Sequence, residues 1–200
     1  MTSWRDRFNK MTGQTRFVVC RLFLHLGGEQ VAPLLGVLNR SAQDAMDSDG
    51  ALDVLGEGLV KICESLLQYD SMWASAANEG NVFWDEGEAG DYVQELFTDS
   101  SQRYLSEPDP TPATSAPTDL YAPATRNVVV MITVAYEGEV PALETDLTKD
   151  VAMKEALKAL INLHYQERLR AIQVHFSPAR FGDELDPDQL LLNFPELAPL

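Results

Sequence analysis

The longest run of β-branched and aromatic residues in the chain is NVVVMITVAYEG, at positions 127–138. Its apolar side chains fall on both faces of an extended chain, which is the pattern of a strand covered on both sides. An amphipathic helical stripe follows at 148–165, and a second alternating segment starts at Leu169. A helix start signal, Asp-Pro-Asp-Gln, begins at Asp186. This order predicts a βαβα unit with a short parallel strand pair and a right-handed crossover helix.

Apolar residues in the amino half recur at helical spacing. They predict four helices, at residues 15–26, 31–45, 52 to about 70, and 88–105. The first is apolar nearly all round, which is typical of a helix buried among other helices. In the third, Gly56 and Gly58 leave room for a neighbouring helix to approach closely. The amino half therefore reads as a helical domain that spans residues 1–105.

A proline-rich stretch separates the two halves. Residues 106–124 contain five prolines among Ser, Thr, Ala and Asp, and they show no apolar periodicity. Such a composition is typical of a linker. We therefore predict an α+β protein in which an N-terminal helical domain is followed by a small βαβα domain, residues 125–200, with a short parallel strand pair.

The charge balance excludes one class of partner. The chain has 15 Lys and Arg against 31 Asp and Glu, a formal net charge of -16, which repels phosphate backbones, so we expect no nucleic-acid partner. Cys20 and Cys63 lie in apolar stretches without metal-ligand spacing, which predicts reduced core thiols and a cytoplasmic location. No run reaches the ~20 apolar residues that span a bilayer.

The amino end is the only basic region of the sequence. Trp4 and Phe8 lie there at helical spacing beside Arg5, Arg7 and Lys10. A short amphipathic helix of this kind can bind an acidic protein partner, or make peripheral contact with a membrane surface. The alternative interpretation is that the segment folds back on the acidic remainder of its own chain.

Four acidic residues gather at the amino end of the fourth predicted helix: Asp85, Glu86, Glu88 and Asp91. Carboxylates can hold Ca²⁺ or Mg²⁺, and together with His175 they would form the site of a metal-dependent hydrolase. However, their order lacks the alternating ligands and central Gly of an EF-hand loop, and acidic residues commonly gather at helix amino ends. A solvated helix start is the favoured interpretation, and we assign no metal and no cofactor.

Catalytic motifs are absent from the sequence. The three histidines, His25, His164 and His175, fall in separate predicted elements. No nucleophile-elbow, zinc-binding or phosphate-binding motif occurs. We therefore assign no catalytic residue and expect a protein that is not an enzyme.

The motifs of the carboxyl half resemble those of a known family. They are a strand that runs into Gly138, the step Ser177-Pro178, and a terminal helix at 189–192 closed by Phe194-Pro195. This order is similar to the family catalogued as domain of unknown function 1517, which is found in cyanobacteria and plastids, and the resemblance covers residues 16–200. It implies no catalytic residues. Plant relatives are associated with thylakoid or envelope membranes.

The resemblance and the missing motifs together predict an accessory, assembly or regulatory protein of a photosynthetic cell, which acts by binding a protein partner. The partner implied is a photosynthetic complex, and the location is cytoplasmic or peripheral at the thylakoid membrane. Two alternatives stay open. One is the metal-dependent hydrolase, and the other is carriage of a small ligand or pigment between the two domains.

Overall fold

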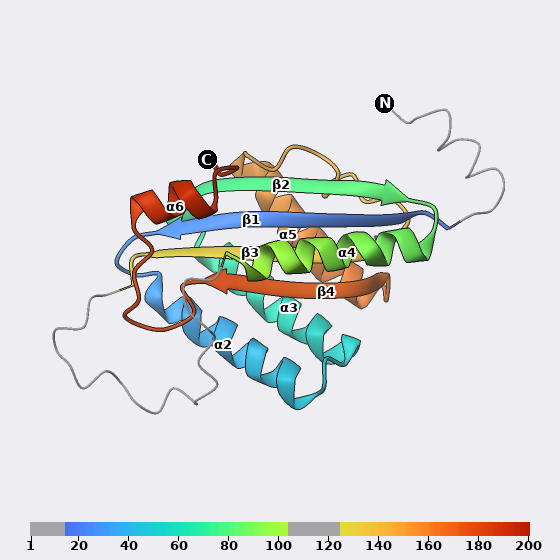
Figure 1. Ribbon diagram of the computed structural model, residues 1–200, viewed down its shortest axis with the longest axis horizontal. Coiled ribbons are helices and arrows are strands. Elements are labelled where there is room, and N and C mark those ends of the chain that lie inside the picture. The colour runs from blue at the N-terminus through green and yellow to red at the C-terminus, as the bar shows by residue number, and fades with distance from the viewer. Residues whose placement is uncertain (1–14, 104–124) are drawn as a thin grey trace.

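The computed structural model describes residues 15–103 and 125–200, which form one five-stranded antiparallel sheet with helices on both faces (Figure 1). The strands lie in the order β4-β3-β1-β2-β5. Their bounds are β1 Phe17–Gly27, β2 Trp73–Phe83, β3 Asn127–Glu137, β4 Leu169–Ser177 and β5 Ala198–Pro199. The helices are α2 Ala32–Asp47, α3 Leu52–Gln68, α4 Glu86–Ser101, α5 Asp150–Tyr165 and α6 Pro187–Asn193, with a 3-10 turn at Asp70–Met72.

β1 takes the place of the first predicted helix. Its sequence is apolar on every side, and such a run does not distinguish a buried helix from a strand covered on both faces. Phe17, Val18 and Val19 favour the strand, because aromatic and β-branched side chains pack well on a pleated surface. Every side chain from Phe17 to Leu24 is buried, and β1 lies between β3 and β2. The prediction of a helix at 15–26 is therefore wrong.

The sequence does not predict β2. Its residues, WASAANEGNVF, are mostly small or polar and alternate only weakly. β2 pairs with β1 along its length, from Phe83 opposite Phe17 to Trp73 opposite Leu26. Gly80 permits the close approach, since a Cβ there would lie 2.8 Å from the backbone oxygen of Val19. The long pairing with β1, not its own side-chain pattern, makes this segment a strand.

β3 and β4 confirm the two predicted strands, but their parallel pairing is wrong. They are antiparallel neighbours, with Thr133 opposite Gln173. After β3 the chain runs back along the sheet before α5 begins. Asn78 of β2 fixes this return, because its Nδ2 donates to the Thr145 oxygen and its Oδ1 accepts from the Leu147 N–H, both at 2.9 Å. α5 therefore ends where β3 ended, and the right-handed parallel crossover does not occur.

The sheet joins both halves of the chain. β1 and β2 precede the proline-rich stretch and β3 and β4 follow it, yet β1 is paired with both β2 and β3. The predicted fold class, an N-terminal helical domain followed by a small βαβα domain with a parallel strand pair, is therefore wrong. The whole of the proposed linker, residues 106–124, lies outside the described residues.

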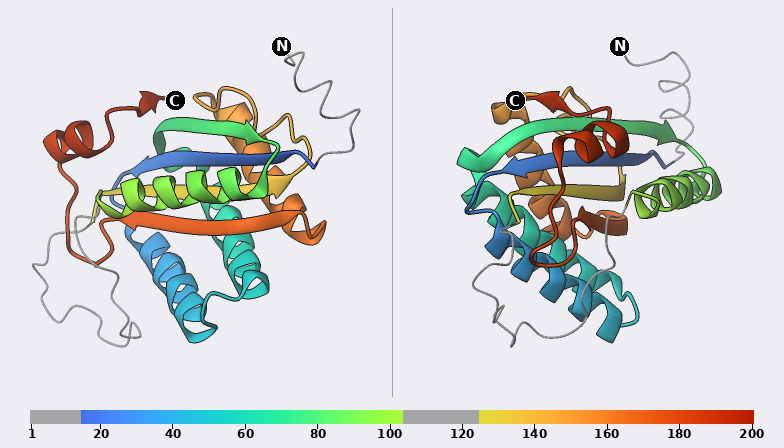
Figure 2. Two further views of the ribbon diagram at one scale, coloured as in Figure 1. Left: turned by 45° about the vertical axis from the view of Figure 1, so that its right-hand side comes forward. Right: turned by 60° about the vertical axis from the view of Figure 1, so that its left-hand side comes forward.

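Helices cover both faces of the sheet: α2, α3 and α5 lie on one face, and α4 and α6 on the other (Figure 2). Side chains of a strand alternate between the two faces. Even-numbered positions of β1 and β3, such as Leu22 and Ile132, enter the larger core with α2, α3 and α5. Odd-numbered positions, such as Val19 and Met131, belong to the smaller clusters on the opposite face.

The predicted helices beyond residue 30 are confirmed, with ends that differ by a few residues. The start signal of α6 is a capping box: Asp186 Oδ1 accepts from the Gln189 N–H at 2.8 Å, and Gln189 Oε1 accepts from the Asp186 N–H at 3.0 Å. Gly56 allows α5 to approach α3, because a Cβ there would lie 2.2 Å from Nδ1 of His164.

Candidate functional site

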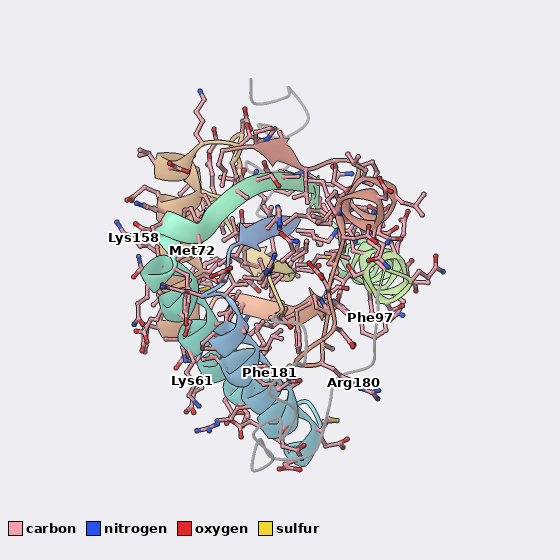
Figure 3. All side chains as sticks on the ribbon, turned by 90° about the vertical axis from the view of Figure 1, so that its left-hand side faces the viewer. Lys61, Met72, Phe97, Lys158, Arg180 and Phe181 are labelled. Carbon is pink, nitrogen blue, oxygen red and sulfur yellow. The ribbon has the colours of Figure 1, made fainter. Side chains whose placement is uncertain are left out.

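An apolar groove runs along the outer edge of β4, at one end of the strand order. Its volume of about 480 Å³ falls within the range of roughly 300–1,000 Å³ that is usual for binding pockets. Residues 172–176 of β4 form one side, α2 and α3 form a wall, and Phe97 of α4 forms the opposite wall. Figure 3 looks along the strands and shows β4 between these walls. The apolar helix residues on the α2–α3 wall are Leu38, Ala42, Ala45, Met46, Leu55, Leu59 and Ile62.

The ladder between β1 and β3 fixes which backbone groups of β4 point into the groove. In an antiparallel pair, hydrogen-bonded residue pairs alternate with non-bonded ones. The Gly28 N–H donates to the Arg126 oxygen at 2.7 Å, and the Gly138 N–H donates to the Arg16 oxygen at 2.8 Å. Both bonds continue the β1–β3 register and join even-numbered residues. Even-numbered residues of β3 therefore make backbone hydrogen bonds to β1, and odd-numbered residues of β3 make them to β4.

The same alternation continues into β4. Because Thr133 lies opposite Gln173, the odd-numbered residues of β4 direct their backbone groups to β3. The N–H and C=O groups of Ile172, Val174 and Phe176 therefore point away from the sheet, into the groove. Within residues 15–103 and 125–200, no further strand pairs with β4.

A buried arginine fixes α4 on the sheet. Arg21 projects from β1 and is only 3% exposed. Its Nη1 lies 2.6 Å from Asp99 Oδ2, and it donates to Ser100 Oγ at 2.8 Å and to the Leu96 oxygen at 3.2 Å, while the guanidinium also pairs with Glu79 of β2. These contacts offset the desolvation cost of burying a guanidinium. The wall that carries Phe97 is therefore anchored to the centre of the sheet.

Arg103 extends this network to the carboxyl-terminal segment. It bonds Asp99 at 3.0 Å, the Asn193 oxygen at 2.9 Å and Glu196 at 2.5 Å. Burial alone would raise the pKa of the Asp99 carboxyl, but its hydrogen bonds and ion pairs with Arg21 and Arg103 outweigh burial and lower that pKa. The network thus holds α4, β1 and the segment after α6 together.

Two polar side chains of β4 lie against the α4 wall. His175 is 3% exposed, and its ring packs edge-on against Phe97 with 5.2 Å between centroids. Burial, and secondly the charge of Arg21, lowers the pKa of His175 to about 4, so the imidazole is neutral at pH 7. Beside it, the buried Oε1 of Gln173 has no hydrogen-bond partner among the described residues. Gln173 therefore adds to the lining of the apolar groove a residue whose buried acceptor is left unpaired by the described residues.

These polar groups belong to one row across the sheet. Glu79 lies opposite Arg21, Arg21 opposite Thr133, and Thr133 opposite Gln173. All four project toward the face that α4 covers. The row links the ion pairs under α4 to the groove at the β4 edge.

A second cleft, of about 530 Å³, lies between β2 and residues 143–146. Its carboxylates already have partners within the fold. Glu144 pairs with Arg16 at 2.6 Å, and Asp146 accepts from the Thr148 hydroxyl at 2.7 Å. These contacts hold the return segment against the sheet and make the second cleft the weaker candidate for a site.

The acidic residues at the amino end of α4 form a helix start. Asp85 is the N-cap, and its Oδ1 accepts from the Glu88 N–H at 3.0 Å. Glu86, Glu88 and Asp91 are exposed on α4. The helical rise places Asp85 roughly 18 Å from Phe97, the residue that contacts His175. In the described ranges, no group of three His, Cys, Asp or Glu side chains could hold a metal ion.

The remaining residues singled out in the sequence are placed only in part. Trp4, Arg5, Arg7, Phe8 and Lys10 lie outside the described residues, so the basic amino-terminal segment stays a prediction. The two cysteines are free and buried, as predicted. Burial raises the pKa of the Cys20 thiol to about 12 and also raises the pKa of Cys63, so neither is a poised nucleophile.

The groove was not predictable as a site from local patterns. Its walls come from α2, α3, α4 and β4, which are distant in the sequence. One signal is present: β4 has no Asp, Glu, Lys or Arg between Arg170 and Arg180, whereas edge strands commonly carry charge. That signal has meaning only once β4 is known to be an edge strand.

No helix in the part of the chain that the structure describes is long and apolar enough to cross a membrane.

A family model matches nearly the whole chain. The family is described as a protein of unknown function (DUF1517), and the match covers residues 16–200. No curated protein and no solved structure matches the chain. The description of the family names no activity, substrate or partner.

Proposed function

The chain belongs to the DUF1517 family, and from that premise we propose that it is a non-enzymatic accessory, assembly or regulatory protein that acts by binding a protein partner. The observation that carries the proposal is the apolar groove at the outer edge of β4. The groove is built from a strand edge and three helices. It offers apolar surface together with backbone groups that pair with no strand in residues 15–103 and 125–200.

Two large apolar side chains of the groove are open to solvent. Met46 is 56% exposed and Phe97 is 41% exposed. Methionine and aromatic residues are enriched at the cores of protein interfaces, and apolar surface that is rimmed by polar groups commonly marks an interaction site. Because the Arg21 and Arg103 network fixes α4, the wall is formed before a partner arrives, which lowers the ordering cost of binding.

The cellular setting is proposed from the resemblance to a family of cyanobacteria and plastids. We propose a photosynthetic cell, a cytoplasmic location and a photosynthetic complex as partner. Peripheral contact at the thylakoid membrane would come from the basic residues of segment 1–13. Deletion of that segment tests the contact: weaker binding to anionic vesicles at an unchanged melting temperature supports it.

The test of protein binding is capture of partners from a cyanobacterial lysate on the immobilised full chain. Met46→Glu places a charge in the groove. Leu192→Glu is the matched control, because Leu192 is 80% exposed on α6 and does not line the groove. We expect at least one protein that the wild type and L192E retain and M46E loses, and that rebinds the wild type after purification. If every captured protein binds M46E as well as the wild type, the proposal fails.

A carrier of a small apolar ligand or pigment is the second candidate. The volume of the groove, about 480 Å³, and the Gln173 acceptor would suit a small molecule with one hydrogen-bond donor. Absorption spectra and native mass spectra of protein purified from a photosynthetic cell test this candidate. A bound molecule that M46E loses and L192E keeps would favour the carrier, and apo protein in all three forms would reject it.

A further inference from the structure

We propose that the groove binds an extended segment of a protein partner as an added β-strand, hydrogen-bonded to the outer edge of β4. The inference rests on the proposed function, because it specifies how the partner binds there. The segment is expected to have apolar residues at alternate positions, a hydrogen-bond donor opposite Gln173, and a basic residue near the turn between α2 and α3.

The outer edge of β4 has the backbone groups that strand addition requires. Those of Ile172, Val174 and Phe176 point outward, and no strand in residues 15–103 or 125–200 pairs with them. The opposite edge of the sheet is covered in part, since β5 pairs with Ser75 and Ala76 of β2 and the return segment bonds Asn78. Within residues 15–103 and 125–200, the outer edge of β4 is therefore unpaired, whereas the outer edge of β2 is covered in part.

β4 also lacks the features that discourage pairing at an edge. Such features are charged side chains, proline and bulges. Residues 171–176 contain no charged side chain and no proline. They also contain no bulge, because the register shift of the β3–β4 pair lies before them, where Ala135 and Tyr136 of β3 pair with Ala171 and Leu169. An uncharged edge without a bulge is a ready template for another strand, so a partner that covers it removes a liability of the isolated protein.

The two walls determine which side chains the added strand should carry. Successive side chains of a strand point to opposite faces. On one face they would meet the α2–α3 wall, which includes Met46 and Leu59, and on the other they would meet Phe97 and Gln173. Apolar residues suit the first wall. Ser, Thr or Asn suits the position opposite the unpartnered Oε1 of Gln173.

Acidic residues lie next to two lining residues of the groove, Met46 and Leu55, along the chain. Asp47 and Asp49 follow Met46 in the chain, and Asp53 precedes Leu55. All three aspartates are exposed. Complementary charge at the rim of an interface accelerates association and orients the partner. A Lys or Arg that flanks the apolar positions is therefore expected in the bound segment.

A second copy of this chain suits the groove less well than a single segment. α2 and α3 extend beyond β4, away from the sheet (Figures 1 and 2). They would meet the second molecule before two β4 strands came within the ~4.8 Å of paired strands. A chain with a net charge of -16 also repels its own copy. An extended segment with basic residues avoids both obstacles.

The test uses a displayed library of random peptides as the probe and the full chain as the target. Val174→Pro removes one outward N–H, and edge strands tolerate proline at such positions. Val174→Thr is the matched control, because it keeps the N–H and a β-branched side chain. We expect selected peptides to alternate apolar and polar residues beside a Lys or Arg. They should bind V174P roughly tenfold more weakly than V174T, which reflects at least one lost hydrogen bond.

Hydrogen exchange on the wild-type chain gives a readout that does not depend on how V174P folds. Binding of a selected peptide should slow exchange of the Ile172 and Val174 amides and leave the amides of β2 unchanged. Unchanged exchange at Ile172 and Val174, or selected peptides that bind as helices, would overturn strand addition. So would a co-purified small molecule that occupies the groove and that no peptide displaces.

The outcomes separate this inference from the proposed function. If M46E loses a protein partner while V174P and V174T bind it equally, protein binding in the groove stands and strand addition is wrong. If M46E also binds the partner as the wild type does, the proposed function fails and the inference fails with it.

Discussion

Arg21 shows how one residue can anchor a whole element. Its guanidinium is buried, and its partners come from β2 and α4. Replacement by methionine would remove the cation and leave Glu79 and Asp99 without it. Because both carboxylates are partly exposed, the cost should lie below that of breaking a fully buried pair. We expect Arg21→Met to lower the free energy of unfolding by about 2 kcal/mol, measured by urea denaturation.

Arg170→Met is the matched control for this substitution. Arg170 pairs with Glu137 at 2.8 Å, but both side chains are more than a third exposed. An exposed ion pair contributes about 0–1 kcal/mol. Equal losses for R21M and R170M would contradict the assignment of Arg21 as the anchor of α4.

His175 makes the stability of the fold depend on pH. Its pKa is lowered by burial to about 4, whereas an exposed imidazole titrates near 6.5. The folded state therefore binds this proton less readily than the unfolded state. The contribution is fully present above pH ~6.5 and is lost as the pH falls toward about 4. We expect the free energy of unfolding to decrease by about 2 kcal/mol between pH 7 and pH 5, measured by urea denaturation.

Other groups also titrate in the acid range, so the experiment needs a control in which His175 is replaced. Burial also lowers the pKa of His25, so part of the decrease should persist in His175→Gln. Asp99 and Glu144 have lowered pKa values, and their contributions are lost only at lower pH, as the carboxylates protonate. His175→Gln should therefore show a clearly smaller decrease between pH 7 and pH 5. An unchanged decrease would mean that another group controls this pH range.

Among the elements, β3 ties the two halves of the chain together, because it pairs with β1 and with β4. Val130→Asp would place an unpaired carboxylate at a site that is 1% exposed. The cost is several kcal/mol, against a total stability of roughly 5–15 kcal/mol. We expect loss of folding in the entire chain, measured by circular dichroism during heating. Val151→Asp makes the same change at a site on α5 that is 74% exposed, and it should melt as the wild type does.

Local patterns predicted the helices better than the strands. The capping box at Asp186 and the apolar faces of α2, α3 and α5 depend on residues close in sequence, so these helices could be predicted from the sequence alone. β1 is covered on both faces, which removes the alternation that distinguishes a strand from a helix. β2 is defined by its long pairing with β1, and its own residues carry little strand preference.

The direction of β4 and the groove depend on contacts between distant segments. Strand direction follows from the return of the chain after β3, which Asn78 of β2 fixes, and β2 was not predicted. The groove appears only when β4 is placed at the edge of the sheet with Met46 and Phe97 on either side. Neither residue is marked by its neighbours in the sequence, so the candidate site could not be predicted.

For the whole molecule, a shared sheet makes each half of the chain depend on the other. Residues 125–200 expressed alone would expose the edge of β3 that pairs with β1, as well as the core surface that α2 and α3 cover. We expect this fragment to show no cooperative thermal transition, and to regain one when it is expressed together with residues 1–124. Circular dichroism checks both outcomes. A cooperative transition of the fragment alone would instead support an independent carboxyl domain.

The place of β1 between β2 and β3 also has a consequence for synthesis on the ribosome. About 100 residues separate the end of β1 from the start of β3, and at 5–20 residues per second that interval lasts roughly 5–20 s. During this interval the edge of β1 that pairs with β3 has no partner, because β3 has not yet been translated. A nascent strand of this kind is prone to pair with the wrong chain. Slower translation of the intervening codons should therefore lower the yield of folded protein, and a chaperone that binds the nascent chain should restore it.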